Sequence, residues 1–379
     1  MTSELSSLCS YAKGKVSVDT LSKRNYVSTE NMMPNKGGIV DAGALPSAQY
    51  TQQYIKDDIL VSNIRPYFKK IWMADDDGGC SNDVLVFRAD RGCDSTFLYY
   101  ILANDAFFNY ASATSKGTKM PRGDKTAIMQ YKVPCFNYET QLRIGKLLRS
   151  IDDRIAVNKN INDNLQQQLF SLYENMATAS PCLKEYTLSN LCDFQEGYVN
   201  PPQTHPEYFD GEVKWLRAVD INESFIIETS RTLTKAGFES AKKSALLFEP
   251  NTIAISKSGT IGRLGIIADY MCGNRAVINI APHDTNMLAF IYCFLKSKQR
   301  EFPDMAVGSV QKNLYVSLLE PLSVSIPDNE SLTAFNAVGA SILGMIHNNC
   351  VENTDLANLR DTILPKLMSG EIDVSSVLL

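Results

Sequence analysis

The chain contains an internal repeat, and this repeat limits the possible folds more strongly than any other feature. The stretch that begins at residue 57, DDILVSNIRPYFKKIWMADDDGGCSNDVLVFRA, and the stretch that begins at 250, PNTIAISKSGTIGRLGIIADYMCGNRAVINIAP, show the same order of features. In each, an apolar strand ends in a serine, a polar turn follows, and two further strands flank a Cys-x-Asn sequence. Both continue into an amphipathic helix, FLYYIL or FIYCFL, and a glycine-containing loop, at an offset near 193 residues. Such self-similarity indicates two domains of one fold, and we expect each to be an α/β domain.

The glycine-rich turn of the second copy, SKSGTIG, raises the question of a phosphate-binding loop. A Walker loop places its lysine after the second glycine and continues into a helix. Here Lys257 precedes Gly259 and Gly262, and the strand-like residues RLGII follow. The counterpart in the first copy, NIRPYFK, contains no glycine. We therefore interpret this stretch as a turn between two strands, where glycine supplies unusual dihedral angles.

Each copy is followed by a long segment with an apolar heptad pattern, which is typical of a coiled coil. In the first segment, steps of four and three give Ile144, Leu148, Ile151, Ile155, Asn158, Asn162, Leu165, Leu169, Leu172 and Met176. A shift of 191 residues gives Phe335, Gly339, Ile342, Ile346, Asn349, Asn353, Leu356, Arg360, Ile363 and Leu367. Gly339 and Arg360 interrupt the second seam, and we expect a local shift to bring Val338 and Leu359 into their places.

The two seams share a central pair of asparagines, and a buried amide is costly unless it finds a partner. If the two helices run antiparallel, Asn158 meets Asn353 and Asn162 meets Asn349. Such a polar layer fixes register and orientation at some cost in stability. The alternative is two separate helices whose asparagines are exposed to solvent.

These patterns divide the chain into four parts. We predict a first domain at 1–135, a first long helix at 136–182, a second domain at 183–327, and a second long helix with a C-terminal tail at 328–379. A helix of about 40 residues spans about 60 Å. The expected fold class is α/β (α+β), with two repeated domains separated by an antiparallel coiled coil that acts as a rigid spacer.

Composition argues against several classes of function. The nine cysteines are scattered without a C-x-x-C pair, and His205, His283 and His347 have no second ligand nearby in sequence. This favours reduced thiols in a cytoplasmic protein without a metal site or other cofactor. No apolar run reaches the ~18 to 20 residues that cross a bilayer, so we expect no membrane partner. The net charge of −5 argues against bulk coating of nucleic acid, so phosphate contacts require local basic clusters.

Several stretches carry a resemblance to a known family. The second copy opens with LCDFQEGYVNPPQTHPEYFDGEVKWLRAVDIN and continues with TLTKAGFESA, and the chain closes with ILPKLMSGEIDV. Together with the two domains and two helices, these stretches resemble the specificity subunit of type I restriction–modification enzymes. The resemblance covers essentially the whole chain and is clearest from 183 to 373. The opening GYVNPP departs from the glycine–threonine–proline that is usual in this family.

The resemblance implies a subunit without a catalytic site of its own. Each target-recognition domain would bind one half of a bipartite double-stranded DNA sequence, and the helices would hold the halves at a fixed spacing. The helices would also dock two methyltransferase (modification) subunits, and restriction (nuclease/translocase) subunits would join that complex. The stretch NPPQ at 200–203 is similar to the Asn-Pro-Pro-aromatic motif of amino-methyltransferases, but Gln203 cannot stack on a flipped base. Two alternatives remain: a self-contained DNA methyltransferase or nuclease, and a coiled-coil scaffold that binds no DNA.

The loops that differ between the copies carry the candidate DNA-binding residues. Phosphate contacts position a protein on DNA, and contacts with base edges specify the sequence. In the first domain the candidates are Asn63, Arg65, Lys69 and Lys70 in the turn and Lys116, Lys119, Arg122 and Lys125 in a basic loop. In the second domain they are Lys257, Ser258, Thr260 and Arg263 in the turn and Gln311, Lys312 and Asn313 in the loop. Shared strands with unlike loops are what two readers of different half-sites require.

Overall fold

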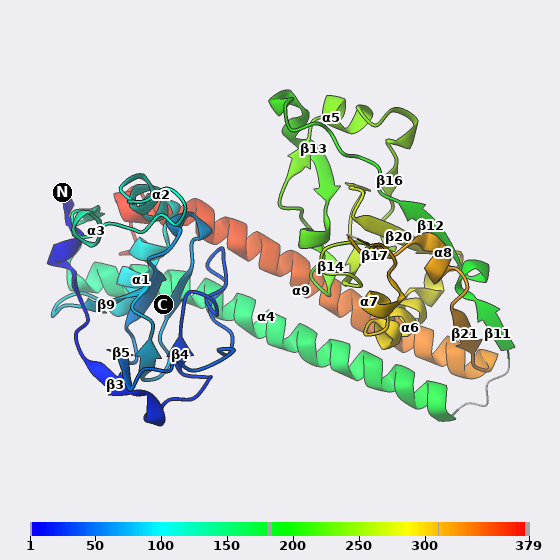
Figure 1. Cartoon of the computed structure of the whole chain (residues 1–379), viewed down its shortest axis with the longest axis horizontal. Helices are drawn as coiled ribbons and strands as arrows, with labels where there is room; N and C mark the ends of the chain where they lie inside the picture. The colour runs from blue at the N-terminus through cyan, green and yellow to red at the C-terminus, as the bar shows by residue number, and fades with distance from the viewer. Residues whose placement is uncertain (1, 180–183, 310, 376–379) are drawn as a thin grey trace. The chain divides into compact units, whose positions relative to one another are not determined.

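The computed structural model describes residues 2–179, 184–309 and 311–375. The chain forms two compact units, each with strands and its own share of the long helices (Figure 1). The first unit consists of Met1–Asp153 and Leu356–Leu379, and the second consists of Arg154–Asp355.

The first unit contains three small sheets and three short α-helices before the first long helix. Its strands are β1 (Thr2–Glu4), β2 (Cys9–Tyr11), β3 (Lys15–Ser17), β4 (Tyr26–Val27), β5 (Tyr50–Tyr54), β6 (Ile59–Ser62), β7 (Ile71–Met73), β8 (Gly78–Cys80), β9 (Val84–Ala89) and β10 (Lys132–Pro134). Its helices are α1 (Ser95–Ala103), α2 (Asp105–Ala113) and α3 (Lys125–Met129), with 3-10 turns η1 (Leu5–Ser7), η2 (Val18–Thr20) and η3 (Pro66–Phe68).

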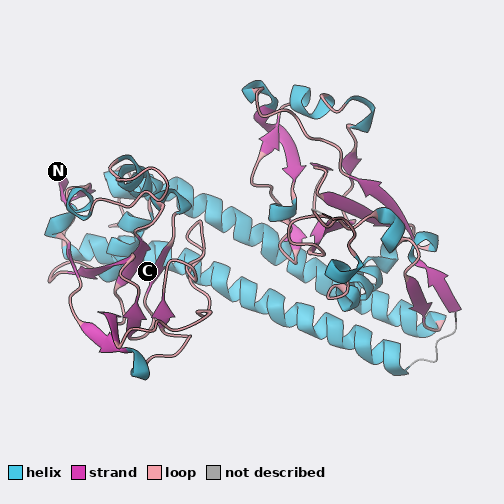
Figure 2. Ribbon diagram, viewed as in Figure 1, coloured by secondary structure: helices cyan, strands magenta, loops and turns pink. Residues whose placement is uncertain are grey.

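The second unit repeats this plan, except that its central sheet has five strands instead of four (Figure 2). Its strands are β11 (Lys184–Thr187), β12 (Cys192–Glu196), β13 (Phe209–Leu216), β14 (Phe225–Ile226), β15 (Thr232–Leu233), β16 (Leu247–Phe248), β17 (Ile253–Ser256), β18 (Leu264–Ile267), β19 (Met271–Gly273), β20 (Val277–Pro282) and β21 (Ser323–Ile326). Its helices are α5 (Lys235–Glu239), α6 (Leu288–Lys298), α7 (Phe302–Met305) and α8 (Val316–Leu319), with 3-10 turns η4 (Leu188–Asn190), η5 (Pro206–Tyr208), η6 (Ala218–Asp220), η7 (Lys242–Ser244) and η8 (Thr285–Met287).

Strand order is the same in the central sheet of both units. The order is β2-β9-β6-β7 in the first and β12-β20-β17-β18 in the second, where β14 adds a further strand at the edge. The strand that opens each domain also pairs antiparallel with the strand that closes it, β1 with β10 and β11 with β21. The predicted fold class of two repeated α/β domains is confirmed.

The central strands are apolar because both of their faces are covered. All four residues of β6 and all four of β17 are buried, which fits short continuous apolar runs rather than an alternating pattern. Helices α1 and α6 cover one face, and residues of the neighbouring sheet, such as Tyr54 in β5 and Phe248 in β16, cover the other. Phe97 and Leu98 in α1, and Phe290 and Ile291 in α6, are almost fully buried. The predicted turn SGTIG connects β17 and β18, which pair antiparallel.

Two long helices, α4 (Tyr138–Ala179) and α9 (Asn329–Ser369), contribute to both units. Helix α9 begins after Asp328, whose carboxylate accepts a hydrogen bond from the Ser331 N–H at 2.8 Å and thereby caps the helix. Among the described residues, no helix combines the length and the apolar character needed to cross a membrane.

The helices run antiparallel where they meet in the second unit. Asn158 Nδ2 donates to Asn353 Oδ1 at 3.0 Å, and Asn349 Nδ2 donates to Asn162 Oδ1 at 2.8 Å. Asn158 and Asn162 are buried, so each amide has the partner that burial demands. Higher residue numbers in α4 pair with lower numbers in α9, which defines the antiparallel direction.

The expected shift at Gly339 and Arg360 is wrong. Val338 and Leu359 remain 49 % exposed, and the interrupting residues stay in the seam. A Cβ added at Gly339 would lie 2.6 Å from the Cβ of Ala289, so glycine allows α9 to approach α6 closely. Arg360 instead forms an ion pair with Asp152 of α4.

Candidate nucleic-acid interface

The turn after β6, residues 63–70, passes through left-handed backbone conformations. Arg65 and Lys69, on either side of η3, have φ angles of 50° and 51°. Residues other than glycine seldom adopt such angles, so neighbouring contacts must hold the turn in place. One of them joins the Arg65 N–H to the Pro121 carbonyl oxygen at 2.8 Å.

The basic loop of the first domain is a short hairpin that is bonded to this turn. Lys116 and Arg122 exchange two backbone hydrogen bonds, of 2.8 and 2.9 Å. The Gly123 N–H then donates to the Asn63 carbonyl oxygen at 3.1 Å. The turn and the hairpin therefore form one continuous surface, the first turn–loop surface, made of residues 63–70 and 116–125.

Two cations of this surface are paired within the domain. Lys116 Nζ lies against the Asp124 carboxylate, and Arg122 Nη2 lies 2.9 Å from Asp83 Oδ1. The hydrogen bond from Lys116 lowers the pKa of Asp124, and backbone N–H groups at the start of α3 lower it further. The positive charges of Lys116 and Arg122 are thus partly neutralised by carboxylates of the same domain in the absence of a ligand.

The side chains of Lys69 and Lys70 also contact polar groups of the first domain. Lys69 Nζ lies 2.8 Å from Asp105 Oδ2, and Lys36 Nζ lies 3.0 Å from the other oxygen of the same carboxylate. Burial opposes ionisation of Asp105, but hydrogen bonds from the two lysines outweigh it and lower its pKa. Lys70 Nζ donates to the Thr29 carbonyl oxygen at 2.6 Å, and burial lowers the pKa of Lys70. These two lysines therefore fix the turn to the rest of the domain.

Lys119 and Lys125 are the exposed basic residues of this surface that have no acidic partner within the part of the chain that the structure describes. Asn63 is buried, and its Oδ1 atom has no hydrogen-bond partner. The first turn–loop surface thus offers Lys119 and Lys125 as exposed, unpaired cations, and the half-buried Arg65 has no acidic partner among the described residues either.

In the second domain the turn after β17 is fixed by Lys257. Its Nζ lies 2.8 Å from Glu196 Oε1 and 4.7 Å from the centre of the Tyr315 ring. The Lys257 side chain is only 13 % exposed. Tyr198 Oη donates to the other oxygen of Glu196 at 3.1 Å. Lys257 therefore supports the turn and is not a free cation.

The second domain joins its turn to its loop in the same way as the first. Val307 and Asn313 exchange backbone hydrogen bonds of 3.0 and 2.9 Å, and the Leu314 N–H donates to the Lys257 carbonyl oxygen at 2.9 Å. Residues 257–263 and 307–314 form the second turn–loop surface, of which residue 310 lies outside the described residues. The two surfaces share their backbone bonds but not their side chains.

The remaining candidates of the second domain lie on this surface. Thr260, Gln311 and Lys312 are exposed, whereas Ser258 and Arg263 are half-buried. Asn313 Nδ2 donates to the Gln311 carbonyl oxygen at 3.1 Å, which stabilises the loop hairpin. Gln311 and Lys312 are therefore the polar side chains of the loop that are most accessible to a ligand.

The stretch NPPQ belongs to an aromatic and cationic cluster that sequence patterns do not reveal. Gln203 Oε1 accepts a hydrogen bond from Arg231 Nη1 at 2.9 Å, and the Arg231 guanidinium lies 4.2 Å from the centre of the Phe209 ring. Trp215 donates from Nε1 to the Val199 carbonyl oxygen at 2.7 Å. The stretch is thus a structural turn, and its partners are too distant in sequence for spacing to identify them.

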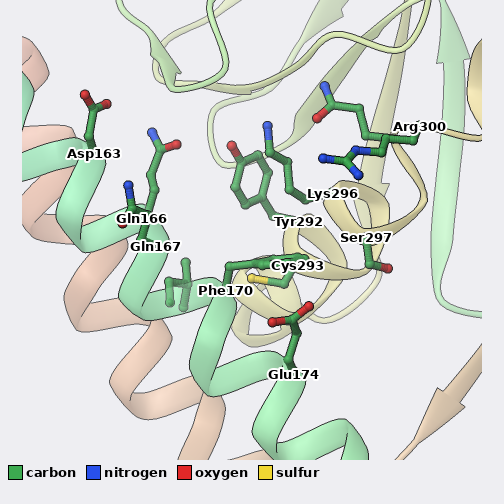
Figure 3. Close-up of a pocket in the computed structure, with 12 residues that line it drawn as sticks. Asp163, Gln166, Gln167, Phe170, Glu174, Tyr292, Cys293, Lys296, Ser297 and Arg300 are labelled. Atoms are coloured by element: carbon green, nitrogen blue, oxygen red, sulfur yellow. The ribbon is translucent and has the colours of Figure 1, made fainter.

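A cleft of about 740 Å³ lies between α4 and α6 in the second unit (Figure 3). Its α6 side carries Tyr292, Cys293 and Lys296, and its α4 side carries polar residues such as Asp163 and Gln167. Lys296 is held by an ion pair with Glu223, and burial raises the pKa of Cys293 to about 12. A thiol with such a pKa is a poor nucleophile near neutral pH.

Within the described residues, no group of three or more His, Cys, Asp or Glu side chains is arranged to hold a metal ion. The cysteines in that part of the chain are all free, and Cys182 lies outside it.

Comparison with known proteins decides the family. The model of the type I restriction modification DNA specificity domain matches twice, at residues 1–167 and 183–354. The chain belongs to this family. As a type I DNA specificity protein, it carries one specificity domain in each repeat. The predicted non-catalytic role is confirmed, because the match is to the specificity component and the curated relatives are named specificity subunits.

Individual relatives agree with this assignment. The specificity protein is 23 % identical over 308 residues to the type I restriction enzyme MjaIX specificity subunit of Methanocaldococcus jannaschii, covering 76 % of this chain and 71 % of that one. It is 27 % identical over 176 residues to the HindI specificity subunit of Haemophilus influenzae, covering 45 % of this chain and 38 % of that one. The crystal structure of a type I S subunit from M. genitalium has the same fold, with a TM-score of 0.56, 18 % identity, and coverage of 97 % and 96 %.

Proposed function

We propose that this chain reads a bipartite double-stranded DNA target in the cytoplasm, one half with each domain, and directs methyltransferase and restriction subunits to it. The single observation that carries the proposal is the pair of turn–loop surfaces. Each is held by equivalent backbone hydrogen bonds, at Asn63 in one domain and at Lys257 in the other, while the side chains differ. A common scaffold with unlike contact residues is what recognition of two different half-sites requires.

The proposed domain limits follow from this role. Residues 1–135 and 183–327 would be the two readers, and residues 136–182 and 328–379 would form the spacer and the C-terminal tail. Helix α4 is continuous over 42 residues, which supports a stiff connection because an α-helix rises about 1.5 Å per residue. The asparagine pairs at 158/353 and 162/349 would set the register of the spacer.

Within the first reader, Lys119 and Lys125 are proposed to contact phosphates. Lys116 and Arg122 would also bind phosphates once these replace their carboxylate partners. Arg65 would reach the same DNA strand, while Asn63, Lys69 and Lys70 would hold the turn in shape. Within the second reader, Ser258, Thr260, Arg263, Gln311, Lys312 and Asn313 are proposed as contact residues and Lys257 as a support.

Methyltransferase subunits are proposed to dock on the helical segments, one on each repeat. The α4 helix exposes Val157 and Ile161 at 48 and 42 %, and also Leu172 at 41 %, where the heptad pattern wrongly predicted a seam position; their spacing places the three on one helix face. Exposed apolar side chains that share a face mark protein interaction sites. Exchange of Ile161 for Glu should therefore reduce co-purification of the methyltransferase subunit, whereas exchange of the exposed Lys159 for Glu should not.

The main experiment exchanges one reader. Residues 183–327 are replaced by the corresponding domain of another specificity protein, and methylated sites are mapped in cells that also make the methyltransferase subunit. The expected result is a change in one half of the recognised sequence, with the other half and the spacing unchanged. A change in both halves would contradict the modular division. A methylation assay of the isolated chain with S-adenosylmethionine should show no activity.

A further inference from the structure

Strand register defines equivalent positions in the two domains more closely than the sequence alone. Ser62 in β6 pairs with Val84 in β9, and Ser256 in β17 pairs with Val277 in β20. These pairs occupy the same place in the two central sheets. Asn82 lies two residues before Val84, and Arg275 lies two residues before Val277. The two residues therefore occupy equivalent structural positions. The Cys-x-Asn pattern in the sequence would instead align Asn82 with Asn274.

The position lies next to each turn–loop surface. The Asn63 N–H donates to the carbonyl oxygen of Asp83 at 2.9 Å, and the Lys257 N–H donates to that of Ala276 at 2.7 Å. Asn82 and Arg275 immediately precede these acceptors in the chain. The segment that contains each of these residues, just before β9 or β20, is thus hydrogen-bonded directly to the turn. It lies beside the turn and the loop as a third part of the surface.

Both side chains are available to a ligand. Asn82 and Arg275 are exposed, and their side chains form no hydrogen bond or ion pair with any residue that the structure describes. Neighbouring polar groups differ in this respect, since Arg122 is paired with Asp83 and Lys257 with Glu196. In the first domain, Asn82 also lines a cleft of about 350 Å³ together with Gln52 and Lys125, so there is open space beside its amide.

The two side chains have different recognition chemistry. An arginine guanidinium can donate two hydrogen bonds to O6 and N7 of guanine, and an asparagine amide can pair with N6 and N7 of adenine. We propose that Asn82 and Arg275 are equivalent specificity-determining residues, which read an adenine in the first half-site and a guanine in the second. This inference rests on the proposed function and names two of the residues that would carry it out.

The test maps the methylated sequence in cells that contain the full chain with its partner subunits. Arg275→Ala should relax one guanine position in the half-site of the second domain and leave the other half unchanged. Asn82→Ala should relax one adenine position in the half-site of the first domain. In duplex binding by the assembled complex, discrimination at the affected position should fall about 5- to 150-fold, because a bidentate pair contributes about 1–3 kcal/mol.

Two further variants separate base reading from phosphate contact. Arg275→Lys keeps the charge but loses the planar pair of donors, so it should relax the same position. Lys243→Ala, at another exposed cation of the second domain, should leave the sequence unchanged. If Arg275→Ala weakens binding equally on all sequences, or leaves the methylated sequence intact, the inference is overturned. The unmodified protein serves as the control in the same experiment. If it methylates a bipartite sequence, the proposed function is supported even when the inference about Asn82 and Arg275 fails. If no bipartite sequence is methylated, the proposed function itself is contradicted.

Discussion

Arg360 in α9 and Asp152 in α4 form an ion pair, with 2.6 Å between Nη1 and Oδ1, inside the apolar seam of the first unit. The other Asp152 oxygen accepts a hydrogen bond from the Tyr100 hydroxyl at 2.6 Å, and burial raises the pKa of that hydroxyl. A shift of 191 residues places Leu169 and Leu343 at the equivalent positions in the second unit, and both are buried in its core. One repeat thus has an ionic contact where the other has an apolar one.

Removal of one partner of this ion pair should destabilise the first unit. Arg360→Leu leaves the Asp152 carboxylate without its cation, and we expect a loss of about 1–3 kcal/mol because both side chains are partly exposed. The triple variant Tyr100→Phe, Asp152→Leu and Arg360→Leu should recover that loss, since an apolar replacement of a whole buried network is often neutral or stabilising. Urea unfolding of the purified chains measures both effects. Equal midpoints for Arg360→Leu and wild type would show that the pair contributes nothing.

Gly339 should be intolerant of a side chain, and Gly344 in the same helix provides the control. Gly339→Ala introduces a Cβ that must displace Ala289, and such overpacking costs about 1–3 kcal/mol. A Cβ at Gly344 meets no atom within 4 Å, so Gly344→Ala should stabilise the helix by up to about 1 kcal/mol. Thermal unfolding midpoints should therefore move in opposite directions. If both substitutions raised the unfolding midpoint, helix propensity alone would account for the stability change at both positions.

The asparagine layer predicts a non-additive pair of substitutions. Asn349→Leu removes the donor to Asn162 Oδ1 and leaves a buried amide oxygen without its partner, at a cost of about 1–3 kcal/mol. Addition of Asn162→Leu replaces both amides by apolar groups, and stability should return to the wild-type value or exceed it. A double-mutant cycle from denaturant unfolding provides the measurement. Additive losses would mean that the two amides act independently.

Glu352 should make stability depend on acid pH. A hydrogen bond from Arg154, and then one from Asn158, lowers the pKa of Glu352 below its usual value of 4.5. A carboxylate whose pKa is lower in the folded state stabilises the fold above its unfolded-state pKa, and this stabilisation disappears as the pH falls through the folded-state pKa. The unfolding temperature of wild type should therefore exceed that of Glu352→Gln at pH 7, and the difference should begin to shrink as the pH falls below the usual value of 4.5 and vanish once the pH is below the folded-state pKa. A difference that does not change with pH across the acid range would assign the effect to packing.

Salt dependence should distinguish the lysines of the first turn–loop surface. Lys119→Ala should lower the slope of log affinity against log salt by about 0.9, the value for one phosphate contact on duplex DNA. Lys116→Ala should change it less, because Lys116 is already paired with Asp124. The triple variant Lys116→Ala, Lys119→Ala and Arg122→Ala should show the largest reduction, and Lys159→Ala on α4 should show none. An unchanged slope for the triple variant would remove this loop from the DNA-binding surface.

Sequence patterns predict the repeated features of this protein better than its individual contacts. The serines at 62 and 256 and the four asparagines are found by comparing the two copies, because similar residues recur at similar offsets. The acidic partners Asp83, Asp105 and Glu196 do not recur, and each lies 36 or more residues from the basic side chain that it pairs with. The one-residue length difference before β20 likewise conceals the equivalence of Asn82 and Arg275, which only strand register reveals.

The first unit is built from both ends of the chain, and this affects how it can form during synthesis. Leu364, Leu367 and Val374 belong to the same buried cluster as Leu5, Phe97 and Ile144. During synthesis, residues 1–153 emerge from the ribosome long before Leu364, Leu367 and Val374 are added to the chain. Part of the core of the first domain is therefore exposed to solvent until the C-terminal segment has been synthesised. A premature stop between residues 183 and 364 would therefore damage the domain encoded first as well as the one encoded last.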